Sequence, residues 1–354
     1  MLPYIGVLVL LTNATIYDKT KYQSIVFFCL ALCLILFSGL RVGGTGPADY
    51  DAYLRLYSQV TDWNLVVDPQ IHAEFGFRLL SFLGNFLDFD GQFIIFAMAA
   101  LSSIPVFIII LRYSCYPILS LVIWMPYFLA MNMHSSRISV AAAFCLCFVI
   151  SFYEKKRLAS MVFFFVALAF HSSSIAILAV LMTKFKLKSL CVIGFLFFAL
   201  SSFIDPFSFL SNAFSFLGAS RISWFIDSYV ASSDYGYPMK IYDPRILLNL
   251  GILCLIYNII RSVNNYFHIY IFKISVLGII FLLLFSSATI IAWRVSYLFL
   301  LAGVISIPIL FQYYNFRVFY IYGFKRVFSI SFGLVFFVYS LTLILKSLPY
   351  SFYF

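Results

Sequence analysis

The stretch GQFIIFAMAALSSIPVFIIIL, residues 91–111, contains no charged side chain and is followed by Arg112. About 20 apolar residues in an α-helix cross the hydrocarbon core of a bilayer, and a helix satisfies its backbone hydrogen bonds internally. Comparable apolar runs recur from one end of the chain to the other. A transmembrane β-barrel would instead show alternating segments of about 10 residues. The sequence therefore predicts an all-α polytopic integral membrane protein.

The apolar runs predict about 12 transmembrane helices in a single membrane domain over residues 1–354. Two longer segments, 42–90 and 205–245, are expected outside the cytoplasm. Within the first of these, the apolar residues 75–87 are too few to cross a bilayer and include Arg78, so we expect a re-entrant or interfacial helix. The expected spans are 1–17, 24–41, 91–111, 117–134, 137–153, 158–170, 172–183, 189–204, 246–262, 268–292, 295–312 and 327–347.

Residues 158–183 allow two interpretations. A single span would place Lys184 on the opposite side of the membrane from Lys155, although lysine and arginine favour cytoplasmic loops. A break at residues 171–174 returns both basic loops to the cytoplasm, and we adopt it. Both chain termini then lie outside.

Lysine and arginine are distributed differently on this topology. Nine of the 11 lysines fall inside, whereas seven of the 12 arginines and 11 of the 13 acidic residues fall outside. The net charge of +10 is thus a cytoplasmic excess that orients the chain, and it does not indicate nucleic-acid binding. An exterior with arginine but few lysines indicates a phosphate site, because the planar guanidinium fork matches phosphate oxygens.

Several other chemistries lack their sequence signature. Six of the seven cysteines lie in apolar runs and Cys115 lies in a cytoplasmic loop, so neither a disulfide framework nor a zinc site is expected. The pair Asp49-x-Asp51 is similar to the carboxylates that hold a metal–nucleotide in soluble glycosyltransferases, but it lies on the wrong side for cytosolic nucleotide sugars. No P-loop, GxGxxG, GxSxG or HExxH is present. We expect no metal and no cofactor.

Two expected outer turns combine hydroxyl groups with an ionisable side chain. In residues 134–137 (HSSR) the serines are N-cap candidates, which places Arg137 in the first turn of the next helix. A cation at this position interacts unfavourably with the helix dipole, unless Arg137 and the free N–H groups of the helix bind the same anion. The alternative interpretation is that the Arg137 side chain reaches out to lipid headgroups. Residues 171–174 (HSSS) repeat the pattern. His171 at membrane depth is either a functional residue or a histidine bonded to a neighbouring helix.

Three further arginines lie where spans are expected to meet the outer face. Trp293-Arg294 is expected to end one span and begin another. Asp243-Pro244-Arg245 has the pattern of an N-cap, a proline at N1 and an arginine in the first turn, and an interfacial role explains Arg245 equally well. Arg41 precedes a glycine-rich turn that leaves the membrane.

A set of short motifs occurs in a fixed order along the first half of the chain. They are Gly39-Leu40-Arg41, Gly46, Asp49-Tyr50-x-x-Tyr53, Glu74-x-Gly76, Arg137, Lys155-Lys156 and Phe170-His171-Ser172. In these motifs the chain resembles the EpsG-type branch of the Wzy polysaccharide polymerases, over residues 1–185. It departs from the family's pattern in two places. Asp51 is a second aspartate inside the Asp-Tyr motif, and Arg137 is followed by Ile-Ser rather than by a sequence that contains glutamine.

The resemblance implies a glycosyltransferase in the bacterial cytoplasmic (inner) membrane, with its active site facing the periplasm or exterior. It would polymerise undecaprenyl-diphosphate-linked oligosaccharide repeat units into O-antigen, capsule or exopolysaccharide. Its partners would be these lipid-linked glycans and the lipid bilayer, with a chain-length regulator protein as a further candidate. Arginine forks would stabilise the diphosphate leaving group without a metal.

The resemblance also implies roles for single residues. Arg137, Arg294 and Arg41 would bind the diphosphate, with Arg245 as a further binding residue. His171 would orient the diphosphate or act as the base, and Asp49 and Glu74 are the competing bases. The aromatic residues Tyr50, Tyr53 and Trp63 would contact the glycan.

Two other classes of protein remain as alternatives. A lipid-linked sugar flippase or transporter would show internal repeats and charges along several helices, and neither is evident. A membrane O-acyltransferase would also use a histidine at membrane depth, but it needs a polar partner near His171.

Overall fold

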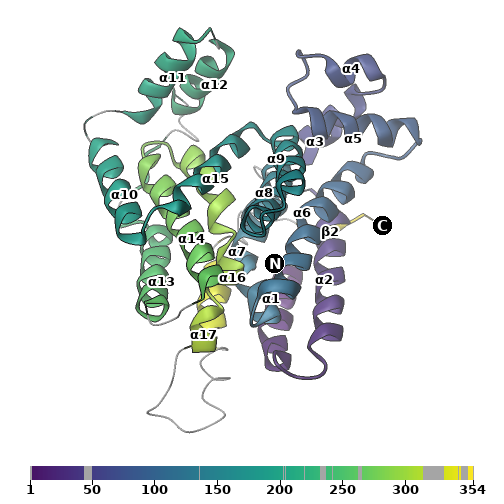
Figure 1. Ribbon diagram of the computed structural model, residues 1–354. Helices are drawn as coiled ribbons and strands as arrows, with labels where there is room; N and C mark the ends of the chain where they lie inside the picture. Colours follow the sequence, from purple (N-terminus) through teal and green to yellow (C-terminus); the bar gives the residue numbers. More distant parts are fainter. Residues whose placement is uncertain are drawn as a thin grey trace. The chain divides into compact units, whose positions relative to one another are not determined.

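A computed structural model of the chain describes residues 2–43, 50–134, 136–201, 203, 205–218, 220–231, 237–240, 242–261, 265–313, 331–341, 343 and 350–353 (Figure 1). These residues are predominantly helical. Two short strands, β1 (Arg41–Val42) and β2 (Ser351–Phe352), form an antiparallel pair. The helical class predicted from the apolar runs is confirmed.

Three of the described helices are long and apolar enough to cross a membrane: α6 (Gln92–Tyr113), α8 (Ser136–Tyr153) and α14 (Tyr266–Leu284). A fourth candidate arises if α15 (Thr289–Leu300) is counted as one broken span with residues 303–313. Most of the remaining apolar helices have 10 to 17 residues. The predicted total of about 12 spans, and the side on which each loop lies, stay predictions.

One compact unit comprises residues 1–174 and 303–354. Within it α8 packs against both α6 and α9, and α2 packs along α6. Trp124 is fully buried, and its ring makes edge contacts with Phe107 and Phe128. Its other elements are α1 (Leu2–Ala14), η1 (Thr15–Tyr17), α2 (Gln23–Gly39), α3 (Tyr50–Gln59), α4 (Trp63–Val67), α5 (Phe75–Phe86), α7 (Pro117–Tyr127), η2 (Phe128–Asn132), α9 (Arg157–Phe170), α16 (Gly303–Ser306) and α17 (Ile309–Tyr313).

The other compact unit comprises residues 175–302. Its α14 contacts α10, α13 and α15. A Cβ atom at Gly278 would lie 2.8 Å from the Leu300 side chain, so glycine is what lets α14 and α15 approach closely. Its other helices are α10 (Leu187–Ser201), α11 (Pro206–Phe216), α12 (Ser220–Ala231) and α13 (Pro244–Ile260), and η3 (Ser172–Lys184) leads into it.

The predicted break at residues 171–174 is confirmed. Helix α9 ends at Phe170, His171 is extended, and the 3₁₀ helix η3 begins at Ser172. The carbonyl of Ala167 accepts the His171 N–H at 3.0 Å, and the hydroxyl of Ser174 donates a second hydrogen bond to it at 3.1 Å. The break therefore has local hydrogen bonds of its own.

The predicted boundary at Trp293-Arg294 is wrong. Helix α14 ends at Leu284 and α15 begins at Thr289, so both residues lie inside α15. Backbone groups of Tyr237 and Met239 hold the turn between α14 and α15. The Thr289 hydroxyl donates to the carbonyl of Tyr237 at 2.8 Å, and the Met239 N–H donates to the carbonyl of Ser286 at 2.7 Å. These long-range partners determine where the turn lies, and a contact of this kind leaves no local signal in the sequence.

The expected outer segment 42–90 is mostly helical. It contains α3, α4 and α5, and α5 contacts α3, α4, α6 and α9. The predicted helix at residues 75–87 is confirmed as α5, and its re-entrant or interfacial position stays a prediction. This segment places the N-terminus of α5 against the end of α9.

Candidate functional site

An ion pair joins the beginnings of two helices in the unit formed by residues 1–174 and 303–354. Glu74 is the N-cap residue of α5, and Arg137 is the second residue of α8. Nη1 of Arg137 lies 2.5 Å from Oε2 of Glu74, and each side chain is 25% exposed. The predicted position of Arg137 in the first turn of its helix is confirmed. The carboxylate also offsets the unfavourable interaction of this cation with the helix dipole.

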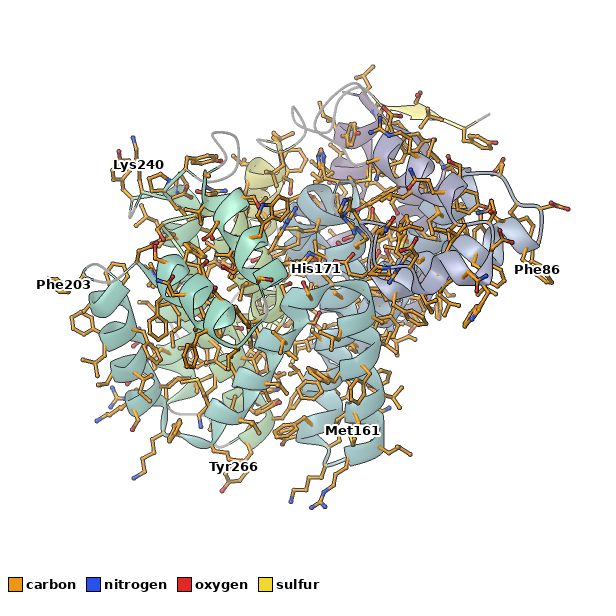
Figure 2. All side chains as sticks on the ribbon, turned by 90° about the horizontal axis from the view of Figure 1, so that it is seen from above. Phe86, Met161, His171, Phe203, Lys240 and Tyr266 are labelled. Atoms are coloured by element: carbon orange, nitrogen blue, oxygen red, sulfur yellow. The ribbon has the colours of Figure 1, made fainter. Side chains whose placement is uncertain are left out.

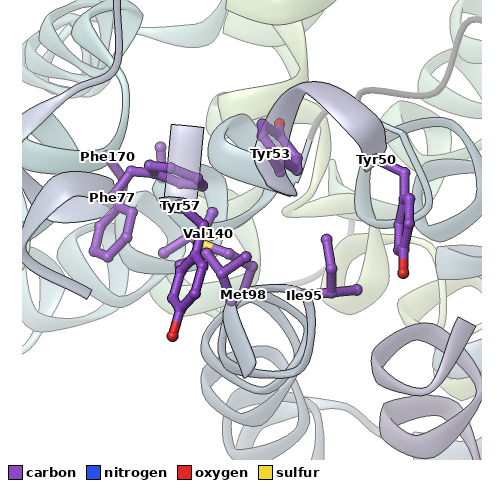
Figure 3. Close-up of a cluster of buried hydrophobic side chains, with 10 residues drawn as sticks. Tyr50, Tyr53, Tyr57, Phe77, Ile95, Met98, Val140 and Phe170 are labelled. Carbon is purple, nitrogen blue, oxygen red and sulfur yellow. The ribbon is translucent and has the colours of Figure 1, made fainter. Parts of the chain in front are cut away.

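Aromatic rings fix the direction of Arg137. Its guanidinium carbon lies 5.7 Å from the ring centre of Tyr53 and 6.0 Å from that of Phe77. The Tyr53 hydroxyl also accepts the backbone N–H of Arg137 at 3.4 Å. Tyr53 and Phe77 belong to a buried cluster with Tyr57, Met98 and Phe170 (Figure 3). Arg137 therefore rests on a packed surface that holds its fork in one orientation.

Gly76 brings the start of α5 against the end of α9. A Cβ atom at Gly76 would lie 2.9 Å from the carbonyl oxygen of Ala169 and 3.0 Å from the ring of Phe170. Only glycine allows α5 to touch the end of α9 at this distance. His171 is the next residue after Phe170, at the opposite end of α9 from Met161 (Figure 2). The motif Glu74-x-Gly76 thus supplies both the carboxylate and the contact with α9.

The hydrogen bonds of His171 define its tautomer. Its Nδ1 accepts the backbone N–H of Ser173 at 3.2 Å and lies 2.7 Å from the hydroxyl of Ser173. An Nδ1 atom that accepts an N–H carries no proton, so the neutral ring carries its proton on Nε2. In this geometry the neutral imidazole is a hydrogen-bond donor at Nε2.

A buried asparagine positions the start of α8. The side chain of Asn132, in the π-helix η2, donates to Ser102 in α6 and accepts from Ser139 in α8, both at 2.8 Å. The Ser136 hydroxyl donates to the Asn132 carbonyl at 3.1 Å. Asn132 is 2% exposed. These bonds fix the first turn of α8, and with it Arg137, relative to α6.

Arg41 lies in β1 and is only 4% exposed. Gln92, at the start of α6, donates through Nε2 to the carbonyls of Gly39 at 2.7 Å and Arg41 at 3.0 Å. Its Oε1 accepts the hydroxyl of Tyr50 at 2.8 Å. Gln92 therefore ties α2, β1 and α3 together. The sequence prediction missed both Gln92 and Asn132, because an isolated amide in an apolar run carries no spacing signal.

The three aromatic residues predicted to contact the glycan differ in how exposed they are. Tyr50 and Tyr53 are buried, at 6% and 2% exposure, whereas Trp63 is 53% exposed. Asp49 lies outside the described residues. The rings of the two tyrosines therefore serve the packed interior, and Trp63 presents the more accessible aromatic surface.

Arg245 and Arg294 lie in the unit of residues 175–302. Asp243 is the N-cap of α13 and Pro244 is its first residue, as predicted. The fork of Arg245 binds both carboxylate oxygens of Asp243, at 2.7 and 2.6 Å, and lies over the ring of Trp293. The hydrogen bonds from Arg245 hold the pKa of the Asp243 carboxyl below its usual range. Arg294 is half-buried within α15.

The comparisons with known proteins give one match. A family model described as the EpsG family matches residues 24–352. No curated protein and no solved structure matches the chain. The family match spans both compact units, and it extends well beyond the residues on which the sequence resemblance rests.

Proposed function

Because the chain belongs to the EpsG family, we propose that it polymerises undecaprenyl-diphosphate-linked oligosaccharide repeat units at the outer face of the cytoplasmic membrane. Family membership and the apolar helices support a membrane protein that acts in polysaccharide polymerisation. The proposal adds the lipid-diphosphate donor, the side of the membrane and the residues that act. Its main support is that Arg137, Glu74, Tyr53 and the end of α9 at His171 converge from four separate helices.

The proposed reaction transfers a glycan between two lipid carriers. The acceptor sugar hydroxyl attacks the anomeric carbon that links the growing glycan to its lipid diphosphate. The new bond is the glycosidic C–O bond, and the bond that breaks joins the anomeric carbon to the diphosphate oxygen. The hydroxyl proton passes to a base, and the lipid diphosphate leaves with the electron pair and its added negative charge.

The arginine forks stabilise the leaving group in this proposal. Arg137 is already oriented by Glu74 and Tyr53, so little reorganisation accompanies the appearance of charge. His171 donates from Nε2 to a phosphate oxygen, a role that its Nδ1 hydrogen bonds favour over that of a base. Arg41, in the same compact unit, is a further diphosphate-binding residue. The diphosphate-binding roles of Arg245 and Arg294 stay predictions from the resemblance.

The base is then a carboxylate, either Glu74 or Asp49. Glu74 lies beside the cation that would hold the leaving group, which keeps it near the reacting carbon. The ring of Tyr53 lies against the guanidinium of Arg137. Of the three aromatic residues predicted to contact the glycan, Trp63 is the most exposed.

The surface glycan of the encoding strain tests the class of protein. After deletion of the gene, we expect glycans capped with a single repeat unit and accumulation of the lipid-linked single repeat. Wild-type protein should restore long chains, whereas Arg137→Ala and His171→Ala should not. Normal chain-length ladders in both variants would overturn the site. Loss of all repeats after deletion would indicate a flippase, and unchanged length with missing acetyl groups would indicate an acyltransferase.

A further inference from the structure

Within the described part of the chain, Arg41 is a buried guanidinium with two nitrogens that have no hydrogen-bond partner. It is 4% exposed, and its Nε and Nη2 have no hydrogen-bond partner among the described residues. None of the described ion pairs includes it. A buried charge without a partner is strongly unfavourable, with a cost of several kcal/mol. An arginine also stays protonated under all ordinary conditions.

Four tyrosine side chains lie near Arg41. The hydroxyls of Tyr4, Tyr50, Tyr53 and Tyr350 interact electrostatically with the guanidinium, and they come from α1, α3 and the C-terminal segment. Tyr50 donates its proton to Gln92, and Tyr350 donates its proton to the carbonyl of Phe37 at 2.8 Å. Neither hydroxyl supplies the negative charge that the guanidinium lacks.

The C-terminal segment, residues 350–353, forms one wall of this region. Strand β2 pairs with β1 so that Phe352 is opposite Arg41, and the Tyr353 N–H donates to the carbonyl of Leu40 at 2.9 Å. The Tyr350 ring stacks on Phe37 with centres 4.5 Å apart and meets Tyr4 edge-on at 5.3 Å. Residues more than 300 positions apart in the sequence therefore enclose Arg41 together.

We infer that Arg41 and the C-terminal segment form a closed oxyanion site for a phosphate-type group. A phosphate oxygen supplies the charge and acceptors that Nε and Nη2 lack, and the planar fork binds two such oxygens at once. The source of the group, the diphosphate of a lipid-linked glycan, rests on the proposed function. The site itself rests on the burial of Arg41 and on its missing partners.

Binding to the purified full-length chain in detergent tests this inference. The probes are inorganic pyrophosphate and farnesyl diphosphate, and the readouts are Kd and the rise in Tm that each probe causes. We expect Arg41→Met to weaken binding about tenfold or more and to remove most of the rise in Tm. The matched control is Arg55→Gln, which removes an exposed arginine of α3 and should bind within about twofold of wild type.

The Tm without probe separates binding from folding. Replacing an unpartnered buried charge with an apolar side chain of similar length should leave the Tm unchanged or higher. Arg41→Met with wild-type Kd values would overturn the inference. A Tm lowered by several degrees without probe would also overturn it, because Arg41 would then have a structural partner.

Two substitutions at Tyr350 test whether the C-terminal segment, residues 350–353, forms part of the site. Tyr350→Phe keeps the ring stacked on Phe37 and should bind within about twofold of wild type, whereas Tyr350→Ala should bind about tenfold more weakly. Wild-type affinity in Tyr350→Ala would exclude the C-terminal segment from the site. Tighter binding of farnesyl diphosphate than of pyrophosphate supports the lipid source, and equal binding supports a free anion. Binding that persists in a chain without polymerising activity would leave this site standing while the proposed function fails.

Discussion

Arg137 and Arg41 are in opposite electrostatic situations within one compact unit. Arg137 is partly exposed and pairs with Glu74, whereas Arg41 is buried and lacks a carboxylate among the described residues. A guanidinium bound to a carboxylate has a fixed direction, and one without a partner gains most from an added anion. We therefore expect Arg137 to determine where the diphosphate lies and Arg41 to contribute affinity for it.

Asp18, like Arg41, is a buried charged residue, and it lies in a loop predicted to be cytoplasmic. Its two carboxylate oxygens accept the backbone N–H groups of Ile118 at 3.0 Å and Leu119 at 2.8 Å, in the first turn of α7. Burial raises the pKa of Asp18 to about 6, because the loss of solvation outweighs these two hydrogen bonds.

Asp18 should make stability depend on pH. Between about pH 4 and pH 6 the folded chain keeps a proton that the unfolded chain has released, so this carboxyl's contribution to the free energy of unfolding falls as pH rises. A pKa that is higher by about 2 in the folded chain than in the unfolded chain changes the free energy of unfolding by about 3 kcal/mol across this window. Tm of the purified chain should therefore have a component that decreases over this window, and Asp18→Asn should remove it. An Asp18→Asn chain with the wild-type slope would contradict the assignment.

At the scale of elements, the contact between α5 and α9 sets the geometry of the site. Gly76 is the point of closest approach, and the atom that a Cβ would meet is a backbone oxygen. Backbone atoms cannot rotate away as a flexible side chain can, so the two helices must separate. That separation moves Glu74 relative to His171.

Gly76→Ala should therefore lower the rate of polymerisation about tenfold, since small displacements of catalytic groups reduce rates strongly. Gly251→Ala is the matched control, because a Cβ there meets nothing within 4 Å and the residue lies inside α13. The control should retain its activity and equal or exceed wild type in stability. Equal activity of the two variants, measured as polymer formed per amount of protein, would show that the α5–α9 contact is not needed.

Two predicted helix boundaries agree with the structure, and they rest on different signals. The capping pair Asp243-Pro244 predicted the start of α13, and the distribution of basic loops favoured the break at which α9 ends. The boundary between α14 and α15 was misplaced because its turn is held by the backbone of residues 237–239, a long-range contact without a local signal. The π-helix η2, which ends at Asn132, also lacked a local signal. The side-chain amide of Asn132 bonds to Ser102 in α6 and Ser139 in α8, and both partners lie on other helices.

At the scale of the whole molecule, one set of residues predicts the membrane topology and another predicts the candidate site. The lysine clusters predict how the chain is oriented in the membrane, and this orientation stays a prediction. The order of short motifs predicted residues that the fold does gather: Arg137, Glu74 and Tyr53 touch, and Gly76 packs against the residue before His171. The pairing of Arg137 with Glu74 was not predicted, because a separation of 63 positions in the sequence gives no measure of their distance in the fold.

Transfer by the purified protein tests the central claim most directly. The chain is placed in liposomes with a lipid-diphosphate-linked single repeat unit, and the products are resolved by length. We expect a ladder of polymers from wild type and from Arg55→Gln, and a rate about 10²–10³ lower from Arg137→Ala. Arg137→Lys should also be slow, because it keeps the charge but lacks the planar fork. Ladders that form at the wild-type rate in both Arg137 variants would contradict a site built on this arginine.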